Sequence, residues 1–385
     1  MNLVDLLPAL PWLAPFAGLA RLAGNRPNLS DVPPASGRFV SIIIPARNES
    51  GTIATVVQSV LATSYRPFEL LVVNDRSTDD TAGVLTRLAA GDPRVRPIEG
   101  ERLPEGWYGK PWACVQGYRA ARGEILLFTD ADTRHEPELL GRSVGAMERE
   151  GADLVTVASR QSCLTFWERV IMPQVFLLLG LRYHPARVNR ATRERDVIAN
   201  GQYILVAREA YEAVGTHAAV RHEVAEDLAL AQAFFRAGHR LHFAFAERLM
   251  ETRMYRGLEP LIEGWSKNVY LGGRRSFPNE PALRALVPLM LGFALLFWLV
   301  PPAALLLTGG AGAWGAAAAA ATALSAVFWI LISYGMQIPV WYGLLYPLGA
   351  AMALYIVARS TWRRGRKVEW RGRVYTDGQG EAVSP

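Results

Sequence analysis

Between residues 38 and 132 the chain alternates short, almost wholly apolar runs with amphipathic segments. The apolar runs are "RFVSIIIPA", "FELLVVND" and "GEILLFTDAD". Runs of this kind are typical of strands that are buried on both faces. The intervening segments "TIATVVQSVLAT", "DDTAGVLTRLAA" and "WACVQGYRAA" carry apolar residues at helical spacing. This alternation predicts an α/β domain whose strands run parallel and are covered by helices on both faces.

A second pattern begins near residue 283, where apolar and small residues follow one another with few interruptions. Asp, Glu, Lys and Arg are absent between Arg284 and Arg359. Because about 20 apolar residues are enough to cross a bilayer, residues 283–358 are expected to be membrane-embedded. The alternative is the buried helical core of a soluble protein. The expected helices are Ala285–Leu307, Trp314–Tyr334 and Val340–Val357.

Basic residues stand on both sides of this apolar tract, in "GGRRSFPNEPALR" before it and in the tail of residues 359–385. Positive flanks favour the cytoplasm, so both ends of the tract are expected on that side of the cell membrane. An even number of crossings is then required. With three apolar segments, either one segment is re-entrant or split, or the charge rule fails here. Pro301 and Pro302 would kink the first segment or make it re-entrant.

Two other segments are expected to contact the membrane. Residues 1–37 are apolar but lack the basic start of a secretory signal, so we do not expect cleavage. Pro8, Pro11 and Pro15 interrupt a helix there, which favours an interfacial anchor over a membrane-spanning segment. Residues 163–185 are expected to form a helix lying in the interface, with an ordinary core helix as the alternative.

The net charge of +6 and the pI of about 9.4 suit an anionic membrane surface or nucleic acid. Because basic clusters flank the apolar tract, we expect the membrane and not nucleic acid as the partner. The tail "KVEWRGRVYT" is expected to be a strand pair that faces the leaflet. Cys114 and Cys163 are too few for a disulfide framework or a metal cluster, and we expect both to be buried.

Each predicted strand ends in polar residues. Arg47, Asn48 and Glu49 follow the first strand, Asn74 and Asp75 close the second, and Asp130 and Asp132 follow the third. The carboxyl ends of parallel strands meet at one rim, which is where ligands bind in such sheets. Asp75 or Glu49 alone would more often be a turn residue than a ligand contact.

The pair Asp130 and Asp132 is harder to explain by turn formation. Two carboxylates this close repel each other unless a cation or hydrogen-bond donors compensate them. A divalent ion such as Mg²⁺ does so, and substrate phosphates typically complete its shell. The chain lacks GxxxxGK[ST], and "ARNESGTI" stands where GxGxxG would follow the first strand. An ATPase or a dinucleotide enzyme is therefore disfavoured, and metal-bridged binding of a nucleoside diphosphate remains.

Four ordered motifs resemble those of family 2 glycosyltransferases: "SIIIPARNES", "VVNDRSTDDT", "GKPWACVQGYRAARGEILLFTDAD" and "EVAEDLALAQAFFRAGHRL". The chain most resembles the membrane-bound branch that glycosylates lipids, including enzymes associated with carotenoid and hopanoid synthesis. The resemblance implies a GT-A fold, with a Rossmann-like mixed sheet, over residues 38–275. It also implies an inverting enzyme that uses a UDP-linked nucleotide-sugar donor and either Mg²⁺ or Mn²⁺. The acceptor would be a lipid of carotenoid, hopanoid or polyprenyl type.

The resemblance also implies roles for individual residues. Asp227 is the expected catalytic base, although it and Glu226 would also suit the positive end of a helix dipole. Glu226, which precedes Asp227, is expected to be a hydrogen-bond acceptor beside the catalytic base. In the donor site, Pro45, Arg47 and Glu49 are expected to surround the nucleoside, and Asp75 is expected to bind the nucleobase. Lys110 is expected at the nucleotide or its phosphates. Asp130 and Asp132 are expected to bind the metal and the diphosphate.

Residues downstream of the base bear on the acceptor. Trp265 is expected to cap the acceptor site, with an interfacial aromatic anchor as the alternative. Lys267 and Arg253 are expected to offer positive charge to the diphosphate. Leu261 and Gly264 occupy the places where the Q/RxxRW motif of processive members has polar residues. This departure argues against a processive polysaccharide synthase.

Taken together, these features predict a multi-pass enzyme of the cell membrane with its catalytic domain facing the cytoplasm. Two other classes share much of the pattern. A nucleotidyltransferase would use the same metal chemistry but release pyrophosphate. A catalytically inactive relative would bind nucleotide or lipid without transferring a sugar.

Overall fold

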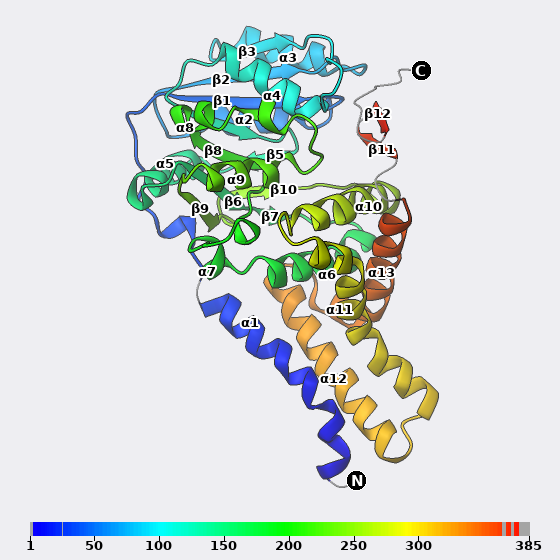
Figure 1. Cartoon of the computed structure of the whole chain (residues 1–385). Coiled ribbons are helices and arrows are strands. Elements are labelled where there is room, and N and C mark those ends of the chain that lie inside the picture. The colour runs from blue at the N-terminus through cyan, green and yellow to red at the C-terminus, as the bar shows by residue number, and fades with distance from the viewer. Residues whose placement is uncertain (1–2, 25, 364–366, 371–372, 377–385) are drawn as a thin grey trace.

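The computed structural model describes residues 3–24, 26–363, 367–370 and 373–376. A seven-stranded sheet in the order β3-β2-β1-β4-β8-β6-β9 forms the centre of one domain, and long helices extend from its lower side (Figure 1). The strands are β1 (Val40–Ala46), β2 (Phe68–Asn74), β3 (Val95–Glu99), β4 (Ile125–Thr129), β6 (Leu154–Ala158), β8 (Tyr203–Ala207) and β9 (Leu241–Phe245). A smaller sheet pairs β5 (Thr133–His135), β10 (Met250–Thr252) and β7 (Arg160–Gln161).

The sheet is mixed, as the family resemblance implied. The three strands expected from the apolar runs, β1, β2 and β4, are parallel to one another. Strand β8 lies between β4 and β6 and runs antiparallel to both. Its register pairs Tyr203 with Thr129, so the turn that leads into β8 lies at the carboxyl end of β4. That position matters for the candidate site.

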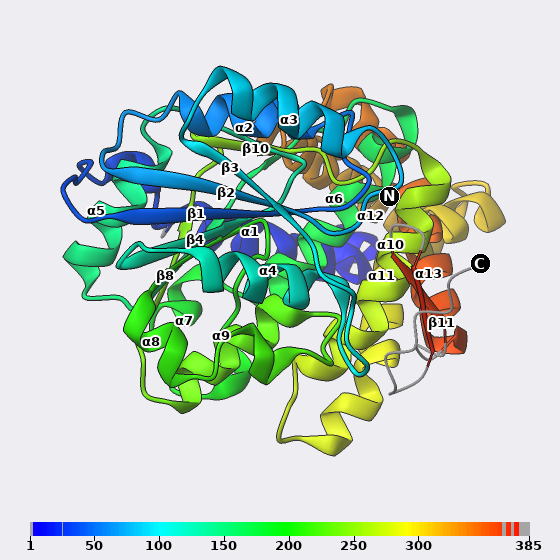
Figure 2. The same cartoon turned by 90° about the horizontal axis from the view of Figure 1, so that it is seen from above.

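Helices cover both faces of the sheet because its strands alternate between two apolar clusters. In β1, Ile42 and Ile44 face one cluster and Ile43 faces the other. The first cluster is covered by α2 (Ile53–Leu61), α3 (Thr81–Gly91) and α5 (Leu139–Glu150). The second is covered by α4 (Gly109–Ala120), α8 (Arg208–Ala213) and α9 (Glu226–Arg236). Figure 2 shows α2 and α3 on the side of the sheet opposite α4.

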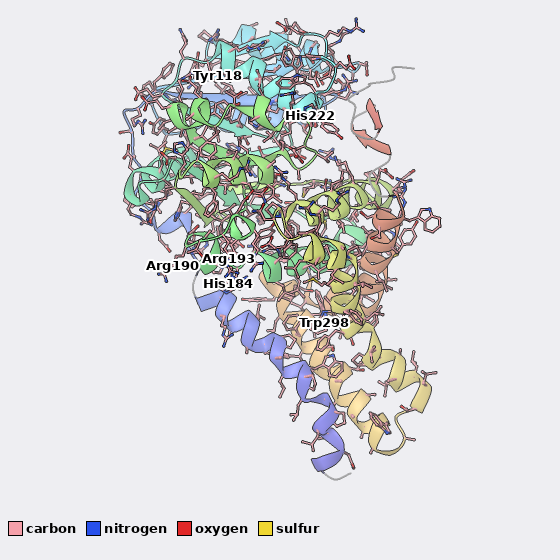
Figure 3. All side chains as sticks on the ribbon, in the orientation of Figure 1. Tyr118, His184, Arg190, Arg193, His222 and Trp298 are labelled. Atoms are coloured by element: carbon pink, nitrogen blue, oxygen red, sulfur yellow. The ribbon has the colours of Figure 1, made fainter. Side chains whose placement is uncertain are left out.

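Three helical segments are long and apolar enough to cross a membrane, as the sequence predicted. Helix α11 (Pro281–Thr308) is continuous through Pro301 and Pro302, and α12 (Gly312–Gly335) follows it after a glycine turn. The third segment begins with the 3-10 turn η5 (Val340–Leu345) and continues as α13 (Tyr346–Arg363). In the cluster that joins these helices, Trp298 of α11 packs against residues of α12 and α13 (Figure 3).

The third segment begins and ends beside the sheet domain. Just after α12, the side chain of Gln337 accepts a 3.0 Å hydrogen bond from Arg160 of β7. At the other end of the segment, Arg359 and Arg363 form ion pairs of 2.8 and 2.7 Å with Glu263. Between these ends, Gly343 is packed so closely on α12 that a β-carbon would lie 2.5 Å from the backbone nitrogen of Ile330.

The N-terminal segment packs along the long helices. It consists of the 3-10 helix η1 (Leu3–Leu13) and α1 (Ala14–Gly24), which lie beside α12 (Figure 1). The indole ring of Trp12 stacks on Phe297 of α11 at 4.7 Å between centroids, and its Nε1 donates a 3.2 Å hydrogen bond to the Phe297 carbonyl. The assignment of the N-terminal segment as an interfacial anchor stays a prediction.

Helices α6 (Phe166–Arg182) and α10 (Leu258–Arg275) lie between the sheet and the long helices (Figure 1). The middle of α6 is buried against α10 and α13, whereas Leu181 near its end is exposed. An interfacial position for α6 stays a prediction.

The tail strands β11 (Lys367–Trp370) and β12 (Arg373–Thr376) pair antiparallel, as expected of a strand pair. The remaining short helices are η2 (Leu29–Asp31), α7 (Pro185–Val188), η3 (Glu194–Asp196) and η4 (His217–Val220).

Candidate active site

A cavity of about 1260 Å³ extends from the carboxyl ends of β1 and β4 to the long helices α11 and α13. Side chains from the sheet domain line one end of it and apolar side chains line the other. Nine of the residues selected from the sequence lie on its wall: Glu49, Lys110, Asp130, Asp132, Glu226, Asp227, Arg253, Trp265 and Lys267.

Lys110 connects two acidic parts of this site. It stands in the first turn of α4, and its Nζ lies 2.7 Å from Asp130 Oδ1 and 2.9 Å from Glu226 Oε1. Burial alone would lower the pKa of Lys110, but the negative charges of Asp130, Glu226 and Asp227 raise it well above its ordinary value. Lys110 therefore carries a positive charge throughout the physiological pH range.

Asp227 is oriented by two backbone donors. It lies in the first turn of α9, where its Oδ2 accepts a 2.8 Å hydrogen bond from the N–H of Gly201 and its Oδ1 a 2.7 Å bond from the N–H of Leu228. Two causes raise the pKa of Asp227 to about 6: burial is the larger, and the negative charge of Glu226 is the next. A carboxylate with such a pKa is suited to accepting a proton near neutral pH.

Glu226 differs from its neighbour Asp227 in its charge environment. Burial would raise the pKa of Glu226, but the positive charge of Lys110 and its hydrogen bond lower it below the ordinary value. Both acids stand in the first turn of α9, which agrees with the expected helix-dipole preference. Both also line the cavity, so stabilising the helix is not their only possible role.

Gly201 completes the floor of the site and was missed by the sequence analysis. A β-carbon at this position would lie 2.9 Å from Lys110 Nζ, 3.1 Å from Asp227 Oδ2 and 3.3 Å from Glu226 Oε1. The carbonyl of Gly201 also accepts a 3.3 Å hydrogen bond from Lys110 Nζ. The Asn200-Gly201 dipeptide is a turn signal, but it does not reveal which residues the turn approaches.

Three expected donor residues lie beside the cavity and not on its wall. Pro45 is within β1, and Asp75 is buried directly after β2. Arg47 Nη1 donates 2.8 Å hydrogen bonds to the carbonyls of Asp75 and Arg76, and thereby joins the exits of the two strands. Arg76 has a φ of 52°, a left-handed conformation that is uncommon outside glycine. The nucleoside roles of Pro45, Arg47 and Asp75 stay predictions, as does that of Glu49.

Two of the residues expected near the acceptor or the diphosphate, Arg253 and Trp265, contact α6. Arg253 Nη2 donates a 3.1 Å hydrogen bond to the buried carboxylate of Glu168, so part of its charge is already neutralised. Trp265 is buried, and its Nε1 lies 3.3 Å from the sulfur of Met172. Trp265 thus forms part of the cavity wall, and its ring does not lie on the lipid-facing surface.

The donor chemistry of the site fits a hard divalent ion that is shared with a substrate. Asp130 and Asp132 present carboxylate oxygens, which Mg²⁺ and Mn²⁺ accept as ligands. Within the described part of the chain, no three His, Cys, Asp or Glu residues are grouped so that they could hold a metal by themselves. An ion at Asp130 and Asp132 would therefore take its remaining ligands from water or from a bound diphosphate.

Comparison with known proteins identifies the domain that contains these residues. Residues 41–227 match the family described as Glycosyl transferase family 2. The chain therefore carries a family 2 glycosyltransferase domain. This family 2 domain contains every expected donor-site residue and, at its last position, Asp227.

A curated relative of this chain is the 4,4'-diaponeurosporenoate glycosyltransferase of Staphylococcus aureus, which is 27% identical over 247 residues. That match spans 63% of this chain and 64% of the relative, which is slightly less than two thirds of the relative's length. Among solved structures, the mannosyltransferase PcManGT of Pyrobaculum calidifontis, in complex with GDP-Man and Mn²⁺, has a TM-score of 0.58 and 19% identity. The match covers 93% of this chain and 99% of PcManGT, so the two share their fold over nearly their whole lengths.

Proposed function

We propose that this glycosyltransferase moves a sugar from a nucleotide-sugar donor, UDP-linked, to a membrane lipid, with inversion at the anomeric carbon. One observation carries the proposal. A single cavity joins the carboxylates Asp130, Asp132 and Asp227 to apolar side chains of α11 and α13, which are helices suited to a membrane. A polar donor and an apolar acceptor therefore have binding surfaces in the same space.

The donor half of the reaction requires positive charge where the diphosphate leaves. A divalent ion, Mg²⁺ or Mn²⁺, bound by Asp130 and Asp132 would stabilise the negative charge that develops on the leaving diphosphate. Lys110 lies beside Asp130 and supplies a second, permanent positive charge at the same place. Glu226 holds the Lys110 ammonium group from the opposite side and keeps it in the cavity.

The acceptor half requires a base. Asp227 removes the proton of the acceptor hydroxyl as its oxygen attacks the anomeric carbon from the side opposite the diphosphate. The N–H groups of Gly201 and Leu228 fix both oxygens of this carboxylate before substrate arrives. Such pre-organisation lowers the cost of reaching the reactive geometry. A single displacement of this kind inverts the configuration of the sugar.

An apolar acceptor agrees with the relative from Staphylococcus aureus, whose name specifies diaponeurosporenoate. For this chain we propose a lipid of carotenoid, hopanoid or polyprenyl type. The side chains of Trp265, Arg253 and Lys267 line the same cavity as the carboxylates and the apolar residues. They are placed to contact the acceptor head or the diphosphate.

We also propose that α11 and α12 each cross the cell membrane, with the catalytic domain on the cytoplasmic side. Because Gln337 and Arg363 both contact the catalytic side, the intervening η5–α13 segment enters the bilayer and returns to the same side. The exposed Arg190 and Arg193 lie at the domain edge that faces α1 (Figure 3), where cytoplasmic anionic headgroups would meet them.

The experiment that tests this function uses the purified full chain in lipid nanodiscs with a panel of nucleotide sugars and a membrane lipid extract. We expect release of UDP and a singly glycosylated lipid, with both lost on chelation and restored by Mg²⁺ or Mn²⁺. Pyrophosphate release would instead indicate a nucleotidyltransferase, and a lengthening glycan a processive synthase. No release from any donor with metal present would indicate an inactive relative and overturn the proposal.

A further inference from the structure

The exposed residues that line the cavity form two groups that differ in polarity. In the catalytic domain they include Gly51, shortly after the carboxyl end of β1, and Arg256. On the helices below the sheet they include Leu181 of α6 and Met290 of α11, whose exposed fractions are 59% and 50%. An opening at the first group suits a water-soluble nucleotide sugar. Met290 lies on a helix that is long and apolar enough to cross a membrane, so an opening at the second group would face hydrocarbon.

Further apolar side chains line the cavity together with Leu181 and Met290. They come from three elements that are distant in sequence, α6, α11 and α13. The cavity-lining residues that represent them are Phe176, Leu179, Leu291, Ala294 and Ile356. A hydrocarbon chain that moves from the bilayer into such a passage exchanges one apolar environment for another. The transfer therefore has little desolvation cost.

The helices that carry Leu181 and Met290 are held together where α6 ends and α11 begins. Arg182 directly follows Leu181, and its Nη2 donates a 2.6 Å hydrogen bond to the carbonyl of Ser276, shortly before α11 begins. The Arg182 guanidinium also lies 4.6 Å from the centre of the Phe277 ring. These contacts fix the end of α6 beside the start of α11, so the opening is part of the fold.

The volume of the cavity is consistent with two ligands. At about 1260 Å³ it exceeds the ~300–1,000 Å³ that is usual for a pocket that binds one small molecule. The polar end contains Asp130, Asp132 and Lys110, which suit a diphosphate. The apolar end then remains for the second substrate.

We propose that the opening between Leu181 and Met290 is a lateral portal for the hydrocarbon chain of the acceptor. The acceptor is a long-chain or isoprenoid alcohol whose chain lies between α6, α11 and α13 while its hydroxyl reaches Asp227. This inference rests on the proposed function, because it assigns the route and chemical class of the acceptor to the same site.

Photolabelling tests the portal without requiring sugar transfer. The probe is a long-chain alcohol with a diazirine at the far end of its chain, added to the full chain in phosphatidylcholine nanodiscs. The variants Leu181→Trp and Met290→Trp narrow the opening. Their controls are Leu164→Trp and Leu289→Trp, at residues that are 57% and 58% exposed but do not line the cavity. Leu289 is the closest match, because it adjoins Met290 on the same helix.

In the wild-type chain we expect labelled peptides that contain Phe176, Leu291 or Ile356. Labelling at these positions should fall by roughly fivefold or more in the two portal variants, because the bulkier indole obstructs the opening. The two control variants should label like the wild type. Melting temperatures of all four variants identify any loss that comes from unfolding.

Equal loss of labelling in Met290→Trp and Leu289→Trp, or no loss in either portal variant, would overturn the portal. Transfer of sugar to the lipid extract is measured on the same samples. Portal-dependent labelling without any transfer by the wild type would overturn the proposed function and leave the portal standing. Transfer that survives both portal variants, with unchanged labelling, would reject the portal and leave the function standing.

Discussion

The backbone N–H of Gly201 donates a 2.8 Å hydrogen bond to Oδ2 of Asp227. This contact joins the turn before β8 to the first turn of α9, two parts of the chain that 26 residues separate. It fixes the carboxylate that the proposed mechanism uses as its base. Substitutions of Asp227 test its role as the base, and substitutions of Gly201 test whether the position of that carboxylate matters.

Replacing the base should separate chemistry from donor binding. In Asp227→Asn the side chain keeps nearly the same shape but can no longer take a proton, so transfer should fall by roughly 10²–10⁴-fold. The dissociation constant for the nucleotide sugar, measured by calorimetry, should change little. Asp31→Asn, at an exposed position, is the control and should retain full activity. Near-normal transfer in Asp227→Asn would assign the base to another residue.

The acid side of the pH profile should report Asp227. Its pKa is raised to about 6, so the base becomes protonated and transfer declines as the pH falls through that value. The negative charge of Glu226 contributes to this raised pKa, after burial. In Glu226→Gln that contribution disappears, and the acid limb of the transfer rate should move to lower pH. A limb that stays in place or moves upward in this variant would contradict the assignment.

Crowding the floor of the site should impair catalysis without unfolding the domain. The β-carbon in Gly201→Ala would approach Lys110 Nζ to 2.9 Å and Asp227 Oδ2 to 3.1 Å, so both charged groups must shift. A displacement near 1 Å in a catalytic group can cost about 10²-fold in rate. We expect a large fall in the maximal transfer rate and a nearly unchanged melting temperature.

Gly91→Ala is the matched control for this experiment. Gly91 ends α3, and a β-carbon there would meet no atom within 4 Å. The variant should keep wild-type activity. If Gly201→Ala is equally active, the close packing of Gly201 has no catalytic importance.

The sequence predicted the acidic site but not the contacts that organise it. Asp130 and Asp132 end an apolar run, and this local pattern selected them. Asp227 opens an amphipathic segment, and the family resemblance selected it as the base. Gly201 depends on β8, which inserts antiparallel between β4 and β6. Hydrophobic periodicity predicts that a strand exists but not which neighbours it pairs with. A contact created by that pairing is therefore not readable from the local sequence.

The boundaries of the third apolar segment show a similar limit. Hydropathy predicted one helix over Val340–Val357, whereas the α-helix starts at Tyr346 and continues to Arg363. Pro347 suits the first turn of a helix, where its missing N–H has no partner to bond. At the other end, Arg359 and Arg363 extend the helix because Glu263 of α10 pairs with both. Hydropathy alone does not predict that a distant acidic residue will pair with the last turn of a helix.

The membrane topology can be tested with cysteine labelling, because both native cysteines are buried. The variants place single cysteines at Ala311 between α11 and α12, at the exposed Trp362 near the end of α13, and at the exposed Arg87 of the catalytic domain. In intact cells, a membrane-impermeant maleimide should label Ala311→Cys only. After permeabilisation it should label all three. If Trp362→Cys reacts together with Ala311→Cys in intact cells, α13 is a full crossing and the topology is wrong.

The hydrogen bond from Trp12 to Phe297 has a consequence for α11 itself. In an α-helix the carbonyl of residue 297 would accept from the N–H of residue 301, but Pro301 has none. A carbonyl left without a donor is costly inside hydrocarbon, where water cannot replace the missing bond. The indole Nε1 of Trp12 supplies that donor. The N-terminal segment therefore replaces one of the backbone hydrogen bonds that prolines remove from α11, a helix that lies 285 residues away in the sequence.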